Sequence, residues 1–153
     1  MRFLPVFFGV FICLAVGFAG SLLQSDALRT WYPFLEKSAL TPPGAVFGGV
    51  WTVLYIMMGV SIGLVWMRKA TDYRGLTGLF ALQLAFNFLW SVAFFLFRSP
   101  WAGMAAISAL LPLIILYAVR SHTHNRLSAW LFLPYIFWVA FAWYLNLYVA
   151  LHN

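Results

Sequence analysis

The chain has 153 residues, of which 65% are hydrophobic and only 8% are charged. A soluble domain is about half apolar and about one-quarter charged, so this composition excludes an ordinary soluble protein. A net charge of +6 would suggest a nucleic-acid partner in a soluble protein. Here the basic residues flank apolar runs, so they report membrane topology. We expect an integral membrane protein whose surroundings are the lipid bilayer, with no nucleic-acid partner.

Short clusters of charged side chains separate five uncharged runs. Each run has the ~20 residues that a helix needs to cross about 30 Å of hydrocarbon. The alternating pattern of a β-barrel is absent, so helices must satisfy the backbone polar groups in lipid. The sequence predicts an all-α membrane protein with one transmembrane domain over residues 1–153, built as a five-helix bundle. The expected helices are 4–24, 43–67, 76–97, 101–120 and 127–150, with a long loop over 25–42.

The first apolar run follows Arg2 and could be mistaken for a signal peptide. It is longer than a signal h-region, and its small residues follow helical spacing, so we expect a transmembrane helix. Six Lys and Arg lie on the N-terminal side of the membrane and three on the other, which predicts a cytoplasmic N-terminus. The expected location is a bacterial cell membrane. An outer membrane is the alternative, where this charge rule lapses.

Small residues recur every fourth position in the first helix, at Gly9, Cys13 and Gly17, and again in the second at Gly59 and Gly63. Such stripes let helix backbones approach closely in a membrane. They fit contacts within one bundle and contacts in a homodimer equally well. The single cysteine leaves no disulfide framework or thiolate metal site.

The stretch 31–51 mixes charges, aromatic residues and a Pro-Pro break, and we interpret it as the lid of a pocket followed by the pocket's first wall. Pro43 suits the first turn of a helix, where a missing N–H costs nothing. Phe47, Trp51 and Tyr55 then follow at four-residue spacing and share one helix face. The sequence therefore predicts an aromatic wall beneath the long loop.

The third helix carries Gln83, Asn87 and Ser91 at four-residue spacing in an otherwise apolar run. Polar side chains are costly in lipid unless they are paired, so this stripe should face the bundle interior. Hydrogen bonding between helices and contact with a ligand explain it equally well, and the neighbouring Trp90 favours a ligand. On the fifth helix, Trp138, Ala142 and Leu145 share one face.

Four motifs occur in order along the predicted spans. They are Trp31-Tyr-x-x-Leu-x-Lys, Thr41-Pro-Pro-x-x-x-Phe-x-x-x-Trp51, Asn87-Phe-x-Trp-Ser and Trp138-x-x-Phe-Ala-x-Tyr-Leu-Asn146. Together they resemble the translocator protein family, which includes the bacterial tryptophan-rich sensory proteins and the mitochondrial peripheral benzodiazepine receptors. The resemblance covers the chain from the first helix to Asn146.

The resemblance implies a compact, often dimeric bundle with a pocket open toward the first loop. It also implies binding of tetrapyrroles such as protoporphyrin IX and of isoquinoline or benzodiazepine ligands. In that family the tryptophans matching Trp51 and Trp138 are implicated in porphyrin binding and, in some members, in light-dependent porphyrin breakdown. Sterol binding is not expected, because no Lys or Arg follows Tyr144 or Tyr148 to complete the sterol motif.

A tetrapyrrole needs aromatic faces for stacking, a few polar groups for orientation and cations near the pocket mouth. Arg29 and Lys37 are the candidate cations. We expect no obligatory cofactor and no metal site, and no axial ligand for haem iron is evident in the spans. The predicted ligand-binding residues are Trp31, Tyr32, Pro42, Phe47, Trp51, Tyr55, Gln83, Asn87, Trp90, Ser91, Trp138, Ala142 and Leu145.

The favoured function is a membrane receptor or sensor for protoporphyrin IX. The alternative is an enzyme that degrades porphyrin in light, with Trp51 or Trp138 as the redox-active residue. The spans hold no acid–base pair or activated nucleophile, so classical catalysis is not expected. A porphyrin or sterol transporter ranks lower, because five spans give no even inverted repeat and no charge lies at the midplane.

Overall fold

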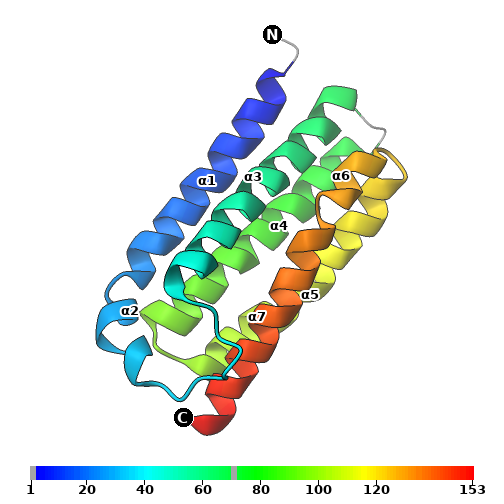
Figure 1. Ribbon diagram of the computed structural model, residues 1–153. Helices are drawn as coiled ribbons and strands as arrows, with labels where there is room; N and C mark the ends of the chain where they lie inside the picture. Colours follow the sequence, from blue (N-terminus) through cyan, green and yellow to red (C-terminus); the bar gives the residue numbers. More distant parts are fainter. Residues whose placement is uncertain (1–2, 70–71) are drawn as a thin grey trace.

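The computed structural model describes residues 3–69 and 72–153. Five long helices lie side by side in an elongated bundle, and the connecting segments lie at its two ends (Figure 1). All five are long and apolar enough to cross a membrane, and the described residues contain no strand. The predicted all-α, five-helix class is confirmed. The long helices are α1 (Leu4–Gln24), α3 (Gly44–Arg68), α4 (Tyr73–Ser91), α5 (Pro100–His122) and α7 (Leu133–His152).

Short helical segments change the expected boundaries. The long loop contains α2 (Ala27–Thr30) and a 3₁₀ turn, η1 (Tyr32–Phe34), and the third span ends in a π-helical turn, η2 (Val92–Leu96). The last span is divided into α6 (Arg126–Trp130) and α7, rather than one helix over 127–150. Pro134 occupies the start of α7, where its missing N–H and fixed φ favour a new helix start.

Close packing of α1 against α3 sets one end of the bundle. A Cβ on Gly59 would overlap the backbone of Val10, and a Cβ on Gly63 would overlap the backbone of Val6. Gly9 would in turn overlap the Gly59 carbonyl. These glycines let the two backbones touch, which is how membrane helices associate without a hydrophobic driving force. At least this part of the small-residue pattern therefore serves contacts inside one bundle.

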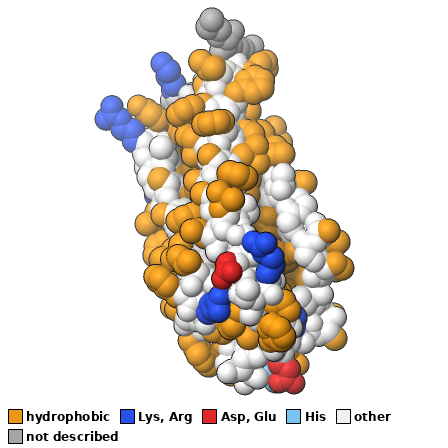
Figure 2. Space-filling model, turned by 90° about the vertical axis from the view of Figure 1, so that its left-hand side faces the viewer, with side chains coloured by type: hydrophobic (Ala, Val, Ile, Leu, Met, Phe, Trp, Pro, Cys, Tyr) orange, Lys and Arg blue, Asp and Glu red, His pale blue; other side chains and the backbone are white. Residues whose placement is uncertain are grey.

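The outer surface is apolar. Large exposed hydrophobic side chains such as Phe7, Phe11 and Phe137 cover the outward faces of the helices. Figure 2 shows hydrophobic side chains over much of one face, with Lys and Arg near its upper part and acidic and basic groups together lower down. This distribution suits a bundle that faces lipid along its length and water at its two ends.

Polar contacts fasten the long loop over one end of the bundle. The Arg98 guanidinium donates to the Asp26 carboxylate at 2.8 Å and to the Thr30 hydroxyl at 3.0 Å. The Ser38 and Tyr144 hydroxyls lie 3.1 Å apart. The loop is thereby tied both to the turn before α5 and to α7.

Candidate ligand-binding pocket

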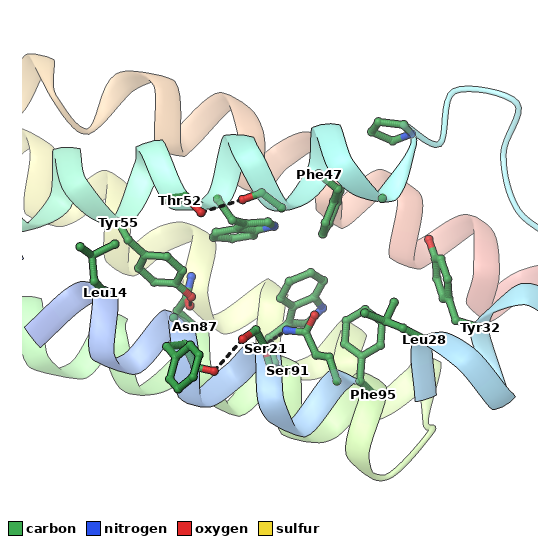
Figure 3. A pocket seen from close by; sticks show the side chains of 18 residues that line it. Leu14, Ser21, Leu28, Tyr32, Phe47, Thr52, Tyr55, Asn87, Ser91 and Phe95 are labelled. Carbon is green, nitrogen blue, oxygen red and sulfur yellow. Dashed lines mark hydrogen bonds between the residues drawn. The ribbon is translucent and has the colours of Figure 1, made fainter. Parts of the chain in front are cut away.

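A cavity of about 520 Å³ lies between α1, α3 and α4, and the long loop covers one end of it. Figure 3 shows α3 along one side of this pocket and α1 along the other, with labelled side chains from both helices pointing into the space between them. Its volume falls in the range of small-molecule sites. The lining residues are Leu14, Gly17, Phe18, Ser21, Gln24, Leu28, Tyr32, Pro42, Gly44, Phe47, Gly48, Trp51, Thr52, Tyr55, Asn87, Trp90, Ser91 and Phe95.

The aromatic wall predicted on α3 lines this pocket. Phe47, Trp51 and Tyr55 point from one face of α3, and the Trp51 ring lies 6.3 Å from Phe47 and 5.8 Å from Tyr55 between centroids. Trp51 also contacts Trp90 of α4 at 5.8 Å and Tyr135 of α7 at 6.2 Å. Rings at these separations attract one another and hold Trp51 in place. Trp51 and its neighbouring rings therefore form an aromatic surface that is already in place before a ligand binds.

The polar stripe of α4 belongs to a chain of hydrogen bonds. The Tyr55 hydroxyl donates to Asn87 Oδ1 at 2.6 Å, and Asn87 Nδ2 donates to the Tyr135 hydroxyl at 2.9 Å. The Tyr135 hydroxyl donates to Gln83 Oε1 at 3.0 Å. Ser91 Oγ accepts from Gln24 Nε2 at 2.9 Å. The stripe therefore faces the interior and joins helices, as the first of the two interpretations held.

Only part of this stripe reaches the cavity. Asn87 and Ser91 line the pocket. Gln83 is fully buried, does not line it, and bonds instead to Tyr135 and to Met58 Sδ at 3.9 Å. Gln83 lies one helical turn from Asn87 and accepts from the fully buried Tyr135 hydroxyl, so it joins the core and not the cavity wall.

The predicted residues Trp138, Ala142 and Leu145 of α7 are not among the residues that line this cavity, whereas Trp51 is. The Phe47 ring contacts Trp51 at 6.3 Å and Trp138 at 5.5 Å. Ala142 and Leu145 line a separate cavity of only about 20 Å³. Four aromatic residues line both cavities and so lie between the α7 side and the α1 side: Tyr32, Phe47, Trp90 and Phe95. The Trp138 indole N–H is buried without an acceptor.

The predicted residues of the long loop are divided in the same way. Tyr32 and Pro42 line the pocket. Trp31 does not, and packs its ring against Phe94 at 5.6 Å. Burial raises the pKa of the Tyr32 phenol above its ordinary value, because desolvation disfavours the phenolate. Tyr32 therefore presents a neutral hydroxyl at the loop end of the pocket.

The two candidate cations, Arg29 and Lys37, differ in whether they have hydrogen-bond donors left for a ligand. Lys37 donates to the carbonyls of Tyr32, Pro33 and Leu35 at 2.9, 3.2 and 2.8 Å, and lies over the Tyr32 ring. An ammonium group has three donors, so Lys37 is fully engaged in holding the 3₁₀ turn. Arg29 is exposed and donates one N–H to the Ser25 carbonyl. Arg29 remains the cation of this pair with donors to spare.

Sequence reasoning missed the contribution of α1. Leu14, Phe18 and Ser21 line the pocket, together with Gly17. A Cβ on Gly17 would lie 2.5 Å from the Tyr55 ring, so this glycine makes room for the aromatic wall. The small-residue stripe marked this face, but a stripe of that kind also predicts simple helix packing. Among the described residues, no three His, Cys, Asp or Glu side chains gather where they could hold a metal ion.

Comparison with known proteins places the chain in a family. A family model described as the TspO/MBR family matches residues 9–151. The chain belongs to the TspO/MBR family. It is 37% identical over 153 residues to the tryptophan-rich protein TspO of Archaeoglobus fulgidus, covering 100% of this chain and 99% of that protein. It is 38% identical over 139 residues to the tryptophan-rich protein TspO of Chlorobaculum tepidum, covering 88% and 87%.

A mammalian relative belongs to the same set. The chain is 34% identical over 125 residues to translocator protein 2 of Canis lupus familiaris, covering 78% of this chain and 72% of that protein. The resemblance seen in the four motifs is therefore confirmed. Five apolar helices and TspO relatives in bacteria and archaea identify an integral, multi-pass membrane protein.

The motif residues of this TspO/MBR protein have distinct places. Five of them, on α3 and α4, line the pocket: Phe47, Trp51, Asn87, Trp90 and Ser91. Asn146 of α7 instead lies behind Trp90. Asn146 Oδ1 accepts from the Trp90 indole N–H at 2.9 Å, and Asn146 Nδ2 donates to the Pro100 carbonyl at 2.8 Å. Asn146 therefore fixes the orientation of Trp90, and through Trp90 it fixes part of the pocket wall.

Proposed function

We propose that this TspO/MBR protein is a membrane receptor or sensor that binds a flat tetrapyrrole such as protoporphyrin IX between α1, α3 and α4. The position of Trp51 carries the proposal. Its indole lines the cavity and is held by contacts with Phe47, Tyr55, Trp90 and Tyr135. Large apolar ligands bind well to rigid aromatic surfaces with few polar groups.

The polar groups of the pocket suit the orientation of such a ligand. Asn87 and Ser91 lie on the wall, and Gln24 and Tyr32 lie toward the loop. No charged side chain is among the described lining residues, so carboxylates of the ligand should point out of the pocket. Arg29 is near that end, one residue after the lining residue Leu28. Flat isoquinoline and benzodiazepine ligands would use the same aromatic wall.

A quenching titration tests the proposal. Protoporphyrin IX is added to the purified protein in lipid nanodiscs, and tryptophan fluorescence is followed to saturation. We expect Trp51→Leu to weaken binding roughly two- to twelvefold, because a stacked aromatic pair contributes about 0.5–1.5 kcal/mol beyond its buried area. Trp101→Leu is the matched control, since Trp101 is exposed and does not line the pocket. Equal affinities for the two variants would refute the assignment.

Light-dependent degradation of the bound porphyrin is the second candidate. It is favoured by the contacts of Trp51 with Trp90 and Tyr135, since oxidisable rings beside the ligand space can donate an electron to an excited ligand. Illumination of the complex in air, with the Soret band followed over time, separates the two functions. Loss of the band in wild type that Trp51→Phe abolishes means turnover. A stable band means binding alone.

A further inference from the structure

Two glycines of α3 border the pocket without any packing reason to be glycine. Gly44, Gly48 and Thr52 recur at four-residue spacing and all line the cavity. A Cβ added to Gly44 or Gly48 would meet nothing within 4 Å, and neither glycine has a positive φ. Gly48 lies within α3, where Gly costs about 1 kcal/mol relative to Ala, whereas Gly44 is the first residue of the helix. Gly44 and Gly48, which we call the bare strip, therefore leave space open where a side chain would otherwise stand.

This strip lies at an edge of the pocket that faces outward. The back wall is buried, with Asn87 1% and Trp90 5% exposed. On the side between α1 and α3, lining residues are exposed, including Phe18 at 65% together with Gly44 and Gly48. No hydrogen bond among residues 3–69 joins α1 to α3. The cavity thus has an exposed rim between the first two spans.

At the loop end of the pocket, hydrogen bonds hold the long loop in place. An approach from water would pass beneath the loop, which Arg98 ties to Asp26 and Ser38 ties to Tyr144. These contacts must break before the loop can lift. An approach between α1 and α3 breaks no hydrogen bond. The glycine contacts between the two backbones lie toward the far end of the bundle, around Gly59, whereas at the pocket Gly17 of α1 meets the Tyr55 side chain. The side route is therefore the less obstructed of the two.

We infer that the pocket fills sideways from the bilayer, through an opening between α1 and α3 whose α3 edge is the bare strip Gly44 and Gly48. This inference rests on the proposed function of the pocket. Residues 44–52 cover about 12 Å of helix at ~1.5 Å per residue, at the loop end of a span. The matching ligand is a flat amphiphile that lies in the leaflet on the side of the long loop, with its rings in hydrocarbon and its carboxylates among the headgroups.

Neighbouring glycines provide the test. Gly48 and Gly49 are both exposed with free space for a Cβ, but only Gly48 is among the lining residues. Stopped-flow quenching with protoporphyrin IX already dissolved in the membrane of proteoliposomes gives the association rate constant, and titration gives Kd. We expect Gly48→Leu to slow association about tenfold, the equivalent of ~1.4 kcal/mol of added barrier. Gly49→Leu should match wild type. Equal association rate constants for the two variants would overturn the inference.

A second pair of variants should change the association rate in the opposite direction, and it still tests the side route if Gly48→Leu binds no porphyrin. Phe18→Ala should speed association, because it removes a ring from the rim, whereas Phe11→Ala should not, since Phe11 is equally exposed but does not line the pocket. Arg98→Ala loosens the loop and should leave the rate unchanged. Faster association in Arg98→Ala, or no effect of Phe18→Ala, would overturn the side route. Absence of binding in wild type would instead refute the proposed function.

Discussion

Asn87 joins the pocket wall to the buried core, and replacing it by leucine should destabilise the bundle. The substitution removes two hydrogen bonds, one from the Tyr55 hydroxyl at 2.6 Å and one to the Tyr135 hydroxyl at 2.9 Å. Such bonds contribute about 0.6 kcal/mol each in a membrane protein. The Tyr55 hydroxyl also loses its acceptor, which costs roughly 1–3 kcal/mol. Tyr135 still donates to Gln83. With the Tyr55 bond counted once, as the unsatisfied donor, and the Tyr135 bond added, we expect a loss of about 1.5–3.5 kcal/mol.

The assay is the free energy of unfolding in lipid bicelles, with Thr52→Val as the matched control. Thr52 also lines the pocket, but its hydroxyl donates to the Gly48 carbonyl of its own helix and joins no other helix. We expect Thr52→Val to change stability by less than about 0.5 kcal/mol. If Asn87→Leu changed the free energy of unfolding as little as Thr52→Val, the hydrogen-bond chain would contribute nothing to stability and the reasoning would fail.

Two further outcomes are expected. Gly59→Ala should lower the unfolding free energy by about 1–3 kcal/mol, because its Cβ would overlap the Val10 backbone, whereas Gly49→Ala, with nothing within 4 Å, should be neutral or stabilising; equal effects would contradict the close packing of α1 and α3. Burial raises the pKa of Tyr32, so its neutral form stabilises the fold below the ordinary pKa of about 10, and this contribution is lost as pH rises through the raised value. The phenolate absorbance difference between wild type and Tyr32→Phe should therefore develop above pH ~10, and development at or below that pH would show that Tyr32 is not desolvated.

The walls on α3 and α4 could be predicted from sequence because each depends on one helix alone. Phe47, Trp51 and Tyr55 share a face by periodicity, and the cost of unpaired polar groups in lipid turns Asn87 inward. Trp138 shows where this reasoning ends. Periodicity places Trp138 and Ala142 on one helix face, but it does not reveal that the Phe47 ring of α3 lies against Trp138.

The rest of the pocket depends on features with no local signature. The π-helical turn Val92–Leu96 changes the phase of the third span, so Phe94 and Phe95 are both buried, at 3% and 4% exposure. Ala93 is buried as well, and a regular 3.6-residue pattern with one apolar face does not predict three consecutive buried residues. Gly17 fits both close packing and a cavity wall. Its role at the pocket depends on how α1 packs against Tyr55 of α3, which is a property of the helix pair.

A structure of the protein with protoporphyrin IX bound in a lipid environment would test the central claim most directly. The account predicts the macrocycle in the cavity between α1 and α3, against Trp51 and Trp90, with its carboxylates toward the loop end near Arg29. A macrocycle bound against Trp138 on the α7 side with the α1 side empty, or bound on the lipid-facing surface, would contradict it.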